Sequence, residues 1–189
     1  MMRRLTNSAL VLVLLAGCAS PAARFYTLSA TPGPTAPAAD LTVAVGPVTI
    51  PAVVDRPQFV LQAGPNEVRM DEFHRWAAPL ANSIARVVAA NLVQLLGTPR
   101  IVLTPPALGA DTEYRVAIQV QRFESALGEA ATLDAVWVVS RSTGSKSQTG
   151  RTTVRESAAE KDYDALAAAH SRALDRLSRD IAAAVQGLR

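Results

Sequence analysis

The stretch LANSIARVVAANLVQLL, residues 80–96, carries the clearest helical pattern in the chain. Its large apolar side chains recur every three or four residues, which places them on one face of a helix. That face consists of Leu80, Ile84, Val87, Val88, Leu92, Leu95 and Leu96. Pro79 suits the first helical turn, and Gly97 suits the end of the helix. Because a helix with one apolar face must be covered by another layer, we expect the fold to be arranged around this stretch.

A second helix is predicted near the C-terminus, over about residues 158–188. Its residues at helical spacing form one largely apolar stripe that includes a single histidine. The stripe consists of Tyr163, Leu166, His170, Leu174, Leu177, Ile181, Val185 and Leu188. Ser157 and Glu160 have the spacing of a capping box, which favours a start there, and Asp162 is a rival start.

Strand patterns fill most of the remaining chain. They are predicted at residues 25–28, 41–50, 59–61, 67–70, 101–103, 114–120, 133–139 and 149–156, the last as an edge strand. We expect a bend or bulge at Gly46-Pro47, and an extended Pro/Ala-rich loop at 29–40. This order predicts one α/β (α+β) domain, in which a mixed, largely antiparallel sheet has two long helices packed on one face.

The first seventeen residues have the pattern of a secretory signal peptide. Arg3 and Arg4 precede an apolar run at 9–16, which is shorter than the roughly 20 residues that a spanning helix needs. The run leads into Leu15-Ala16-Gly17-Cys18, which resembles the bacterial lipobox. The resemblance implies cleavage before Cys18, acylation of Cys18, and attachment to a membrane by acyl chains. The alternative is an ordinary cleaved signal with an incidental cysteine.

These motifs divide the chain into three parts. Residues 1–17 are the signal peptide, and residues 18–40 hold the lipidated cysteine, the first short strand and the Pro/Ala-rich loop. Residues 41–189 form the remainder of a single periplasmic domain, which includes strand 25–28. Ala19 follows the cysteine where an aspartate would favour retention at the inner membrane, so the lipoprotein sorting rule favours the periplasmic face of the outer membrane.

The charge and the cysteine content of the chain argue against nucleic-acid binding and against an intrachain disulfide. The net charge is +3, but without Arg3 and Arg4 only 17 basic residues remain against 16 acidic ones, a net charge of +1. No basic cluster is interleaved with aromatic residues, so nucleic-acid binding is not predicted. With one cysteine in the chain, no intrachain disulfide can form.

The sequence offers no strong catalytic or metal-binding pattern. Neither His74 nor His170 has a second His or Cys at ligand spacing, and each is expected to be a partly buried or surface histidine. Asp71 and Glu72 lie near His74, but adjacent side chains point in different directions, which disfavours acid–base catalysis. Motifs of a nucleophile elbow or a phosphate loop are absent from the sequence. We therefore expect no enzyme activity, no metal and no cofactor.

A polar and aromatic cluster lies between the predicted strands and the first helix. It comprises Asp55-Arg56-Pro57-Gln58 and, further along, Arg75-Trp76. One interpretation is structural, with Trp76 filling the core and Asp55 and Arg56 forming a local ion pair. The other is a partner-binding surface, because Trp and Arg are enriched at interface hot spots.

Three stretches together resemble the ABC-type transport auxiliary lipoprotein component family, which includes the PqiC/YmbA-type lipoproteins. They are Phe25-Tyr26-Thr27-Leu28 soon after Cys18; Val45-Gly46-Pro47-Val48 with Ile50-Pro51 and Asp55-Arg56-Pro57-Gln58; and Trp76-Ala77-Ala78-Pro79-Leu80 leading to Asn91-Leu92. The family often has Glu where Ala78 stands, which puts a local contact in doubt.

The resemblance implies an auxiliary subunit rather than an enzyme. Its partners would be an MCE-domain protein and the associated ABC transporter subunits, which move lipids between the inner and outer membranes. The lipoprotein would dock that assembly to the outer membrane, and copies of it would form a ring. Two other classes stay open: an assembly lipoprotein of another envelope machine, such as a lipopolysaccharide-export plug or a pilotin, and a periplasmic enzyme with convergent titratable groups.

Overall fold

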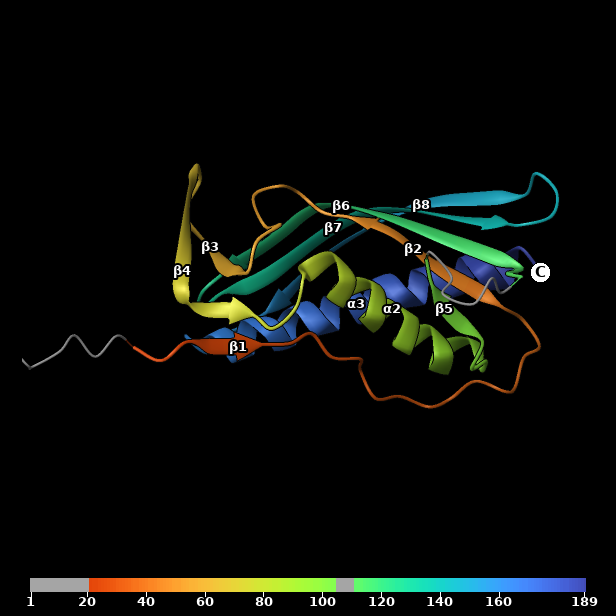
Figure 1. Cartoon of the computed structure of the whole chain (residues 1–189), viewed down its shortest axis with the longest axis horizontal. Coiled ribbons are helices and arrows are strands. Elements are labelled where there is room, and N and C mark those ends of the chain that lie inside the picture. The colour runs from red at the N-terminus through yellow and green to blue at the C-terminus, as the bar shows by residue number, and fades with distance from the viewer. Residues whose placement is uncertain (1–20, 105–110) are drawn as a thin grey trace, which may run out of the picture.

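Two helices lie side by side against one face of a five-stranded sheet (Figure 1). The computed structural model describes residues 21–104 and 111–189. The helices are α2 (Leu80–Leu96) and α3 (Tyr163–Gly187). The sheet has the order β5-β2-β6-β7-β8, built from β2 (Val43–Thr49), β5 (Ile101–Leu103), β6 (Tyr114–Ala126), β7 (Ala130–Arg141) and β8 (Ser147–Ser157). The predicted α/β class, with two long helices on one face, is confirmed.

The five-stranded sheet combines parallel and antiparallel pairs. β6, β7 and β8 form an antiparallel meander, whereas β2 runs parallel to both of its neighbours, β5 and β6. The bend expected at Gly46-Pro47 is present as a shift in the β2–β6 register between Val45 and Val48. β8 lies at the edge of the sheet, as predicted.

A second, three-stranded sheet stands at one end of the molecule, a division that the sequence patterns did not predict (Figure 1). Its order is β1-β4-β3, with β1 at Arg24–Tyr26, β3 at Gln58–Gly64 and β4 at Glu67–Trp76. The predicted hairpin is confirmed, but β4 is longer than expected and β1 is shorter than strand 25–28. Pro51 and Pro57 bound the preceding loop, and proline has no N–H to continue a ladder, so the hairpin forms a sheet of its own.

Both predicted apolar stripes face the core. On α2 only Leu95 of the predicted face is partly exposed, and on α3 only Tyr163 and Leu188 are. Burying each leucine or isoleucine contributes roughly 1.5–3 kcal/mol, so these stripes supply much of the driving force for folding. His170 was expected to be partly buried or on the surface, but it is fully buried because its stripe faces the sheet.

The helix ends correct two sequence-based predictions. Pro79 occupies the N-cap position of α2 rather than its first turn, and Gly97 ends the helix in the left-handed conformation, with φ 65°. The predicted capping box at Ser157 is wrong, because Ser157 is the last residue of β8 and pairs with Ala130. α3 instead begins after the rival, Asp162, whose carboxylate accepts a hydrogen bond of 2.7 Å from the amide of Ala165.

The Pro/Ala-rich segment 29–40, here called the strap, is extended as expected and runs along the helix pair. Five of its backbone amides donate hydrogen bonds to helix groups: Ser29 to Ser171 Oγ at 3.1 Å, Thr31 to Asn91 Oδ1 at 3.1 Å, Gly33 to Gln94 Oε1 at 3.0 Å, Ala36 to the Gln94 carbonyl at 2.8 Å and Ala39 to the Gly97 carbonyl at 3.0 Å. Since these donors are satisfied, the strap is part of the folded domain and not a loose linker.

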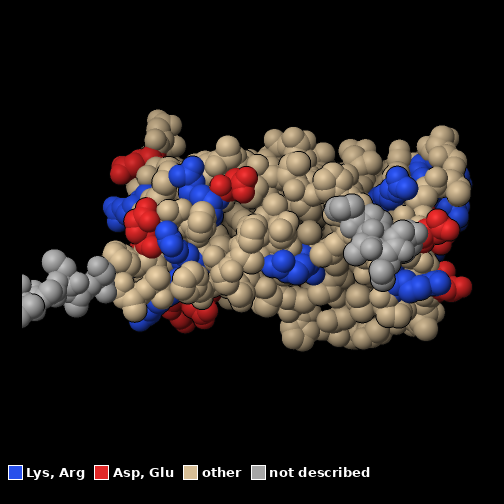
Figure 2. Space-filling model, viewed as in Figure 1, with Lys and Arg blue, Asp and Glu red and all other residues tan. Residues whose placement is uncertain are grey.

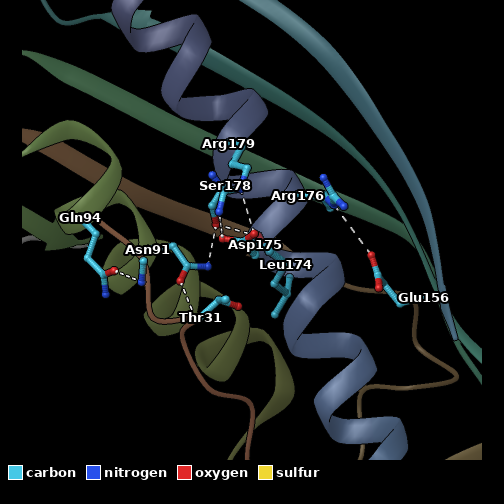
Figure 3. Close-up of polar contacts among 10 residues, drawn as sticks. Thr31, Asn91, Gln94, Glu156, Leu174, Asp175, Arg176, Ser178 and Arg179 are labelled. Carbon is cyan, nitrogen blue, oxygen red and sulfur yellow. Dashed lines mark hydrogen bonds and ion pairs between the residues drawn. The ribbon is translucent and has the colours of Figure 1, made fainter. Parts of the chain in front are cut away.

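Asn91 joins the strap and both helices (Figure 3). Its side chain is buried, its amide nitrogen lies 3.1 Å from Ser178 Oγ on α3, and its carbonyl oxygen accepts from Thr31. Ser178 in turn donates to the Leu174 carbonyl at 2.7 Å. A buried amide is tolerated only when its groups are paired, and here each has a partner.

We expect Asn91→Ala to destabilise the protein by about 1–3 kcal/mol, because it removes the acceptor of the Thr31 amide and the donor to Ser178 Oγ. Urea-induced unfolding measures the change. Asn82→Ala, at an exposed position on the same helix, is the matched control for helix propensity and should have little effect. Equal free energies of unfolding for the two variants would contradict the role assigned to Asn91.

Candidate functional site

A groove of about 370 Å³ lies where the loop before β3 meets the chain entering α2. It is lined by Asp55, Arg56, Pro57, Trp76, Ala77, Ala78, Pro79 and Leu80. The two stretches are held together by the Trp76 amide, which donates to the Pro57 carbonyl at 2.7 Å. Residues that are about twenty positions apart in the sequence thus form one surface.

Trp76 fills the core beneath the groove, as the structural interpretation predicted. Its indole is 6% exposed and stacks on Phe59 with ring centroids 4.3 Å apart. Phe123 and His170 meet the same indole edge-on, at 6.1 and 6.3 Å. The three-stranded sheet is thereby joined to β6 and α3.

Asp55 and Arg56 do not form the local ion pair that the structural interpretation included. No contact between their side chains is found among the ion pairs of the described residues. The Asp55 side chain is exposed, and the Arg56 guanidinium instead donates from Nη1 to Met70 Sδ at 2.8 Å. One wall of the groove therefore carries an exposed carboxylate and a half-buried guanidinium, while Ala77 to Leu80 form an apolar wall.

Gln58 and Arg75 lie next to this groove but do not line it. They are opposite each other in the β3–β4 pairing, and both approach Glu72. The Gln58 amide donates to Glu72 at 3.2 Å, and an Arg75 nitrogen lies 3.6 Å from a Glu72 oxygen. The structure thus gathers Asp55, Arg56 and Trp76 at the groove and places the other two candidates in a neighbouring polar patch.

A second cluster, not predicted from the sequence, joins β1, β4 and the start of α3. The rings of His74 and Tyr163 stack with centroids 3.8 Å apart, and the Tyr26 hydroxyl lies 2.6 Å from His74 Nδ1. The Tyr163 hydroxyl donates to Asp71 at 2.6 Å. Tyr26 and Tyr163 are so distant in sequence that no local pattern could have linked them.

Burial and hydrogen bonds within this cluster shift the pKa values of Asp71 and Tyr163. Burial opposes ionisation of Asp71, but hydrogen bonds from Tyr163 and from the amides of Phe73 and His74 outweigh it and lower the pKa of its carboxyl. Burial and the bond to Asp71 raise the pKa of Tyr163. Because the carboxylate already accepts three hydrogen bonds, it is poorly placed to act as a general base.

His170 and Ser125 form a hydrogen-bonded His–Ser pair of the kind found in some catalytic sites. Ser125 Oγ lies 2.8 Å from His170 Nε2, and Phe123 stacks on the imidazole at 3.7 Å. Ser125 is 2% exposed and His170 is 0% exposed, so a substrate has no access to either side chain. Burial lowers the pKa of His170 to about 3, which keeps the ring neutral. The pair is therefore part of the core packing.

Within residues 21–104 and 111–189, no three His, Cys, Asp or Glu side chains come together in a way that could hold a metal ion. Neither helix in these ranges is both long enough and apolar enough to cross a membrane. Cys18 and the predicted signal peptide lie outside the described residues.

A family model for the ABC-type transport auxiliary lipoprotein component matches residues 26–182. The match extends from β1 through the strap and the groove into the last turns of α3. The chain belongs to this family. The resemblance inferred from the three stretches is confirmed, and the family is one of auxiliary transport components rather than of enzymes.

Solved structures share the fold of this auxiliary lipoprotein. A crystal structure of an uncharacterized protein has a TM-score of 0.71 at 18% identity and covers 87% of this chain and 99% of that chain. The protein XCC0632 from Xanthomonas campestris has a TM-score of 0.70 at 21% identity, with 87% and 97% covered. A PelC dodecamer from Paraburkholderia phytofirmans reaches a TM-score of only 0.48 at 14% identity, with 82% and 96% covered. A comparison with curated proteins finds no match.

Two of the three stretches that carry the family resemblance meet at the groove of this auxiliary lipoprotein. Asp55-Arg56-Pro57 supplies one wall, and Trp76 to Leu80 supplies the base and the other wall. Ala78, the residue at which the third stretch departs from the expected family pattern, is among the lining residues. Asn91, at the end of the third stretch, fastens the strap to the helices and has no part in the groove.

We expect the free energy of unfolding to fall as the pH drops below about 6.5. Below that pH His170 is protonated in the unfolded chain, whereas in the folded protein it is buried and stays neutral. With a folded-state pKa of about 3, the loss reaches about 2 kcal/mol at pH 5. Urea unfolding at pH 7.5 and pH 5 measures it, and His170→Leu should remove this part of the difference. The Asp134 carboxyl, whose pKa the Arg151 hydrogen bond lowers to about 2, acts in a more acidic range. If His170→Leu lost as much stability between pH 7.5 and pH 5 as the unmodified protein, His170 would not be responsible.

Proposed function

We propose that this protein is a periplasmic auxiliary lipoprotein that docks an MCE-type ABC transport assembly to the outer membrane for lipid movement between the membranes. The observation that carries the proposal is the family match over residues 26–182, combined with the lipobox-like Leu15-Ala16-Gly17-Cys18 just before it. Removal of residues 1–17 and acylation of Cys18 would then provide the anchor. Two or more acyl chains bind a membrane stably, whereas one binds only marginally.

The groove is the surface that we assign to the transporter partner. It presents an exposed carboxylate and a half-buried guanidinium opposite an apolar wall, so it suits a chain segment with both apolar and polar side chains. Buried Trp76 makes the base of the groove rigid, which lowers the ordering cost of binding. An anchored protein also meets its partner at a raised effective concentration, so a modest interface is sufficient.

The proposal predicts that an MCE-domain protein and its ABC subunits co-purify with the tagged full-length protein after gentle solubilisation of its native cells. Ala77→Trp, which fills the groove from an exposed position, should reduce their recovery at least about tenfold, because a blocked hot spot costs about 2 kcal/mol or more. Ala183→Trp, at an exposed position on α3, is the matched control and should leave recovery unchanged. Mass spectrometry of the eluate provides the measurement.

Cys18→Ala tests the anchor in the same experiment. We expect the variant to lose the mass of the acyl chains, to leave the membrane fraction and to recover less of the partner. Recovery of a lipopolysaccharide-export or secretion machine in place of the MCE assembly would overturn the transporter assignment and favour another assembly lipoprotein. Formation of a ring by copies of the chain stays a prediction, which the native mass of the acylated protein in detergent would test.

A further inference from the structure

Exposed large apolar side chains gather at the end of the molecule that carries the three-stranded sheet. Phe25 on β1 is 62% exposed, and Val68, Met70 and Phe73 on β4 are 40–41% exposed. The two strands are neighbours, because Arg24 pairs with His74 in the β1–β4 ladder. Exposed apolar residues scattered singly are normal on proteins, but a group of them marks a contact surface.

Leu127, in the turn between β6 and β7, belongs to the same end. The adjacent Gly128 lies directly against the Lys161 side chain, and Lys161 lines one hollow with Arg24 and Phe25. Five of the seven exposed large apolar side chains among the described residues therefore lie here; the other two are Val53 and Leu103. We call Phe25, Val68, Met70, Phe73 and Leu127 the apolar end.

The apolar end is also where the chain arrives from Cys18. Five residues, 19–23, lie between Cys18 and Arg24, the first residue of β1, and the six residue steps of a fully extended chain reach at most about 20 Å. α3, which runs along the body of the molecule, has 25 residues and is therefore about 37 Å long. An acyl anchor at Cys18 thus holds the apolar end, and not the opposite end, close to the bilayer.

We propose that the apolar end rests in the headgroup region of the membrane and contacts lipid directly. This inference depends on the acylation of Cys18 that belongs to the proposed function. Phenylalanine, methionine and valine side chains would enter the boundary between headgroups and acyl chains, as they do in interfacial segments. Arg24 and Arg69 flank them on the same strands, and long arginine stems let the charged group stay in water.

The short tether explains why lipid, and not a protein partner, covers this end. A folded domain of about 100 residues has a radius of gyration near 13 Å and is therefore roughly 30 Å across. A gap of at most about 20 Å between β1 and the anchor does not admit such a domain. The groove meets the apolar end at one point, where Arg56 donates to Met70. Its apolar wall, from Ala77 to Leu80, contains none of the five residues of the apolar end, so lipid contact there and partner docking at this wall can coexist.

Charge does not drive this contact. The same end carries acidic as well as basic side chains, and Glu67 and Glu72 lie on β4 beside Arg69 and Arg75. Figure 2 shows charged side chains of both signs at this end of the visible face. We therefore expect the contact to form on zwitterionic lipid and to persist at high salt, which screens exposed charges.

The test places an environment-sensitive fluorophore on the acylated full-length protein in phosphatidylethanolamine/phosphatidylcholine vesicles. Phe73→Cys puts the label at the apolar end, and Val68→Cys gives a second position that keeps Phe73 intact. Ser145→Cys, in the exposed loop between β7 and β8 at the opposite end, is the control. Acylated Cys18 has no free thiol and does not react with the label.

We expect lipids that carry a quencher just below the headgroups, at a depth of about 5–10 Å, to quench the labels at 68 and 73 but not at 145. Raising the salt concentration should leave the quenching unchanged. Labels at 68 and 73 that stay as exposed to water as the label at 145 would overturn the inference. If the labels at 68 and 73 became shielded from water only after transporter subunits were added, this end would be assigned to a protein partner instead.

The mass of the mature protein separates this inference from the proposed function. If Cys18 carries acyl chains and the labels at 68 and 73 remain in water, the lipid contact is wrong while the anchored auxiliary role stands. If Cys18 carries no acyl chain, the tether argument fails and the inference falls with the anchor. Co-purification of the transporter subunits reports on docking independently of both results.

Discussion

The contact of Trp76 with Phe59, Phe123 and His170 is the interaction on which the rest of the structure depends. A small sheet needs a hydrophobic face or a packing partner to be stable. Trp76, the last residue of β4, provides that contact, because its ring lies between β3 and the layer formed by β6 and α3. The position of the groove above it, and of the exposed strand face beside it, follows from this one buried indole.

The strap is a second constraint on how the strands and helices are placed relative to one another. It connects β1, the strand nearest the proposed anchor, to β2 at the far end of the helix pair, and its backbone donors are satisfied along the way. Because it is fastened by Asn91 and Gln94, only the few residues before β1 are left to act as a tether. An anchor at Cys18 would therefore present the groove at a nearly constant height above the membrane.

The candidate site was predictable only in part. The residues Asp55, Arg56 and Trp76 could be singled out from their types and from the family resemblance, and they do share one groove. The interpretations of Trp76 as a core residue and as part of a surface turn out to be compatible, because its ring is buried while the chain around it lines the groove. The network of Tyr26, His74, Tyr163 and Asp71 was not predictable, since its members come from three separate elements.

The sequence by itself determined the two helices, nearly every strand and the order of elements, because hydrophobic periodicity and turn residues are local signals. It also contains the lipobox-like Leu15-Ala16-Gly17-Cys18, a contiguous motif on which the predicted anchor depends. Only the tertiary structure decided that the strands form two sheets and that α3 begins at Tyr163 instead of Ala158. It also decided that His170 is fully buried, and that the apolar side chains of β1 and β4 share one end. These features depend on competition between distant partners: Ser157, for example, is a good helix cap whose pairing with Ala130 in the β7–β8 ladder takes precedence.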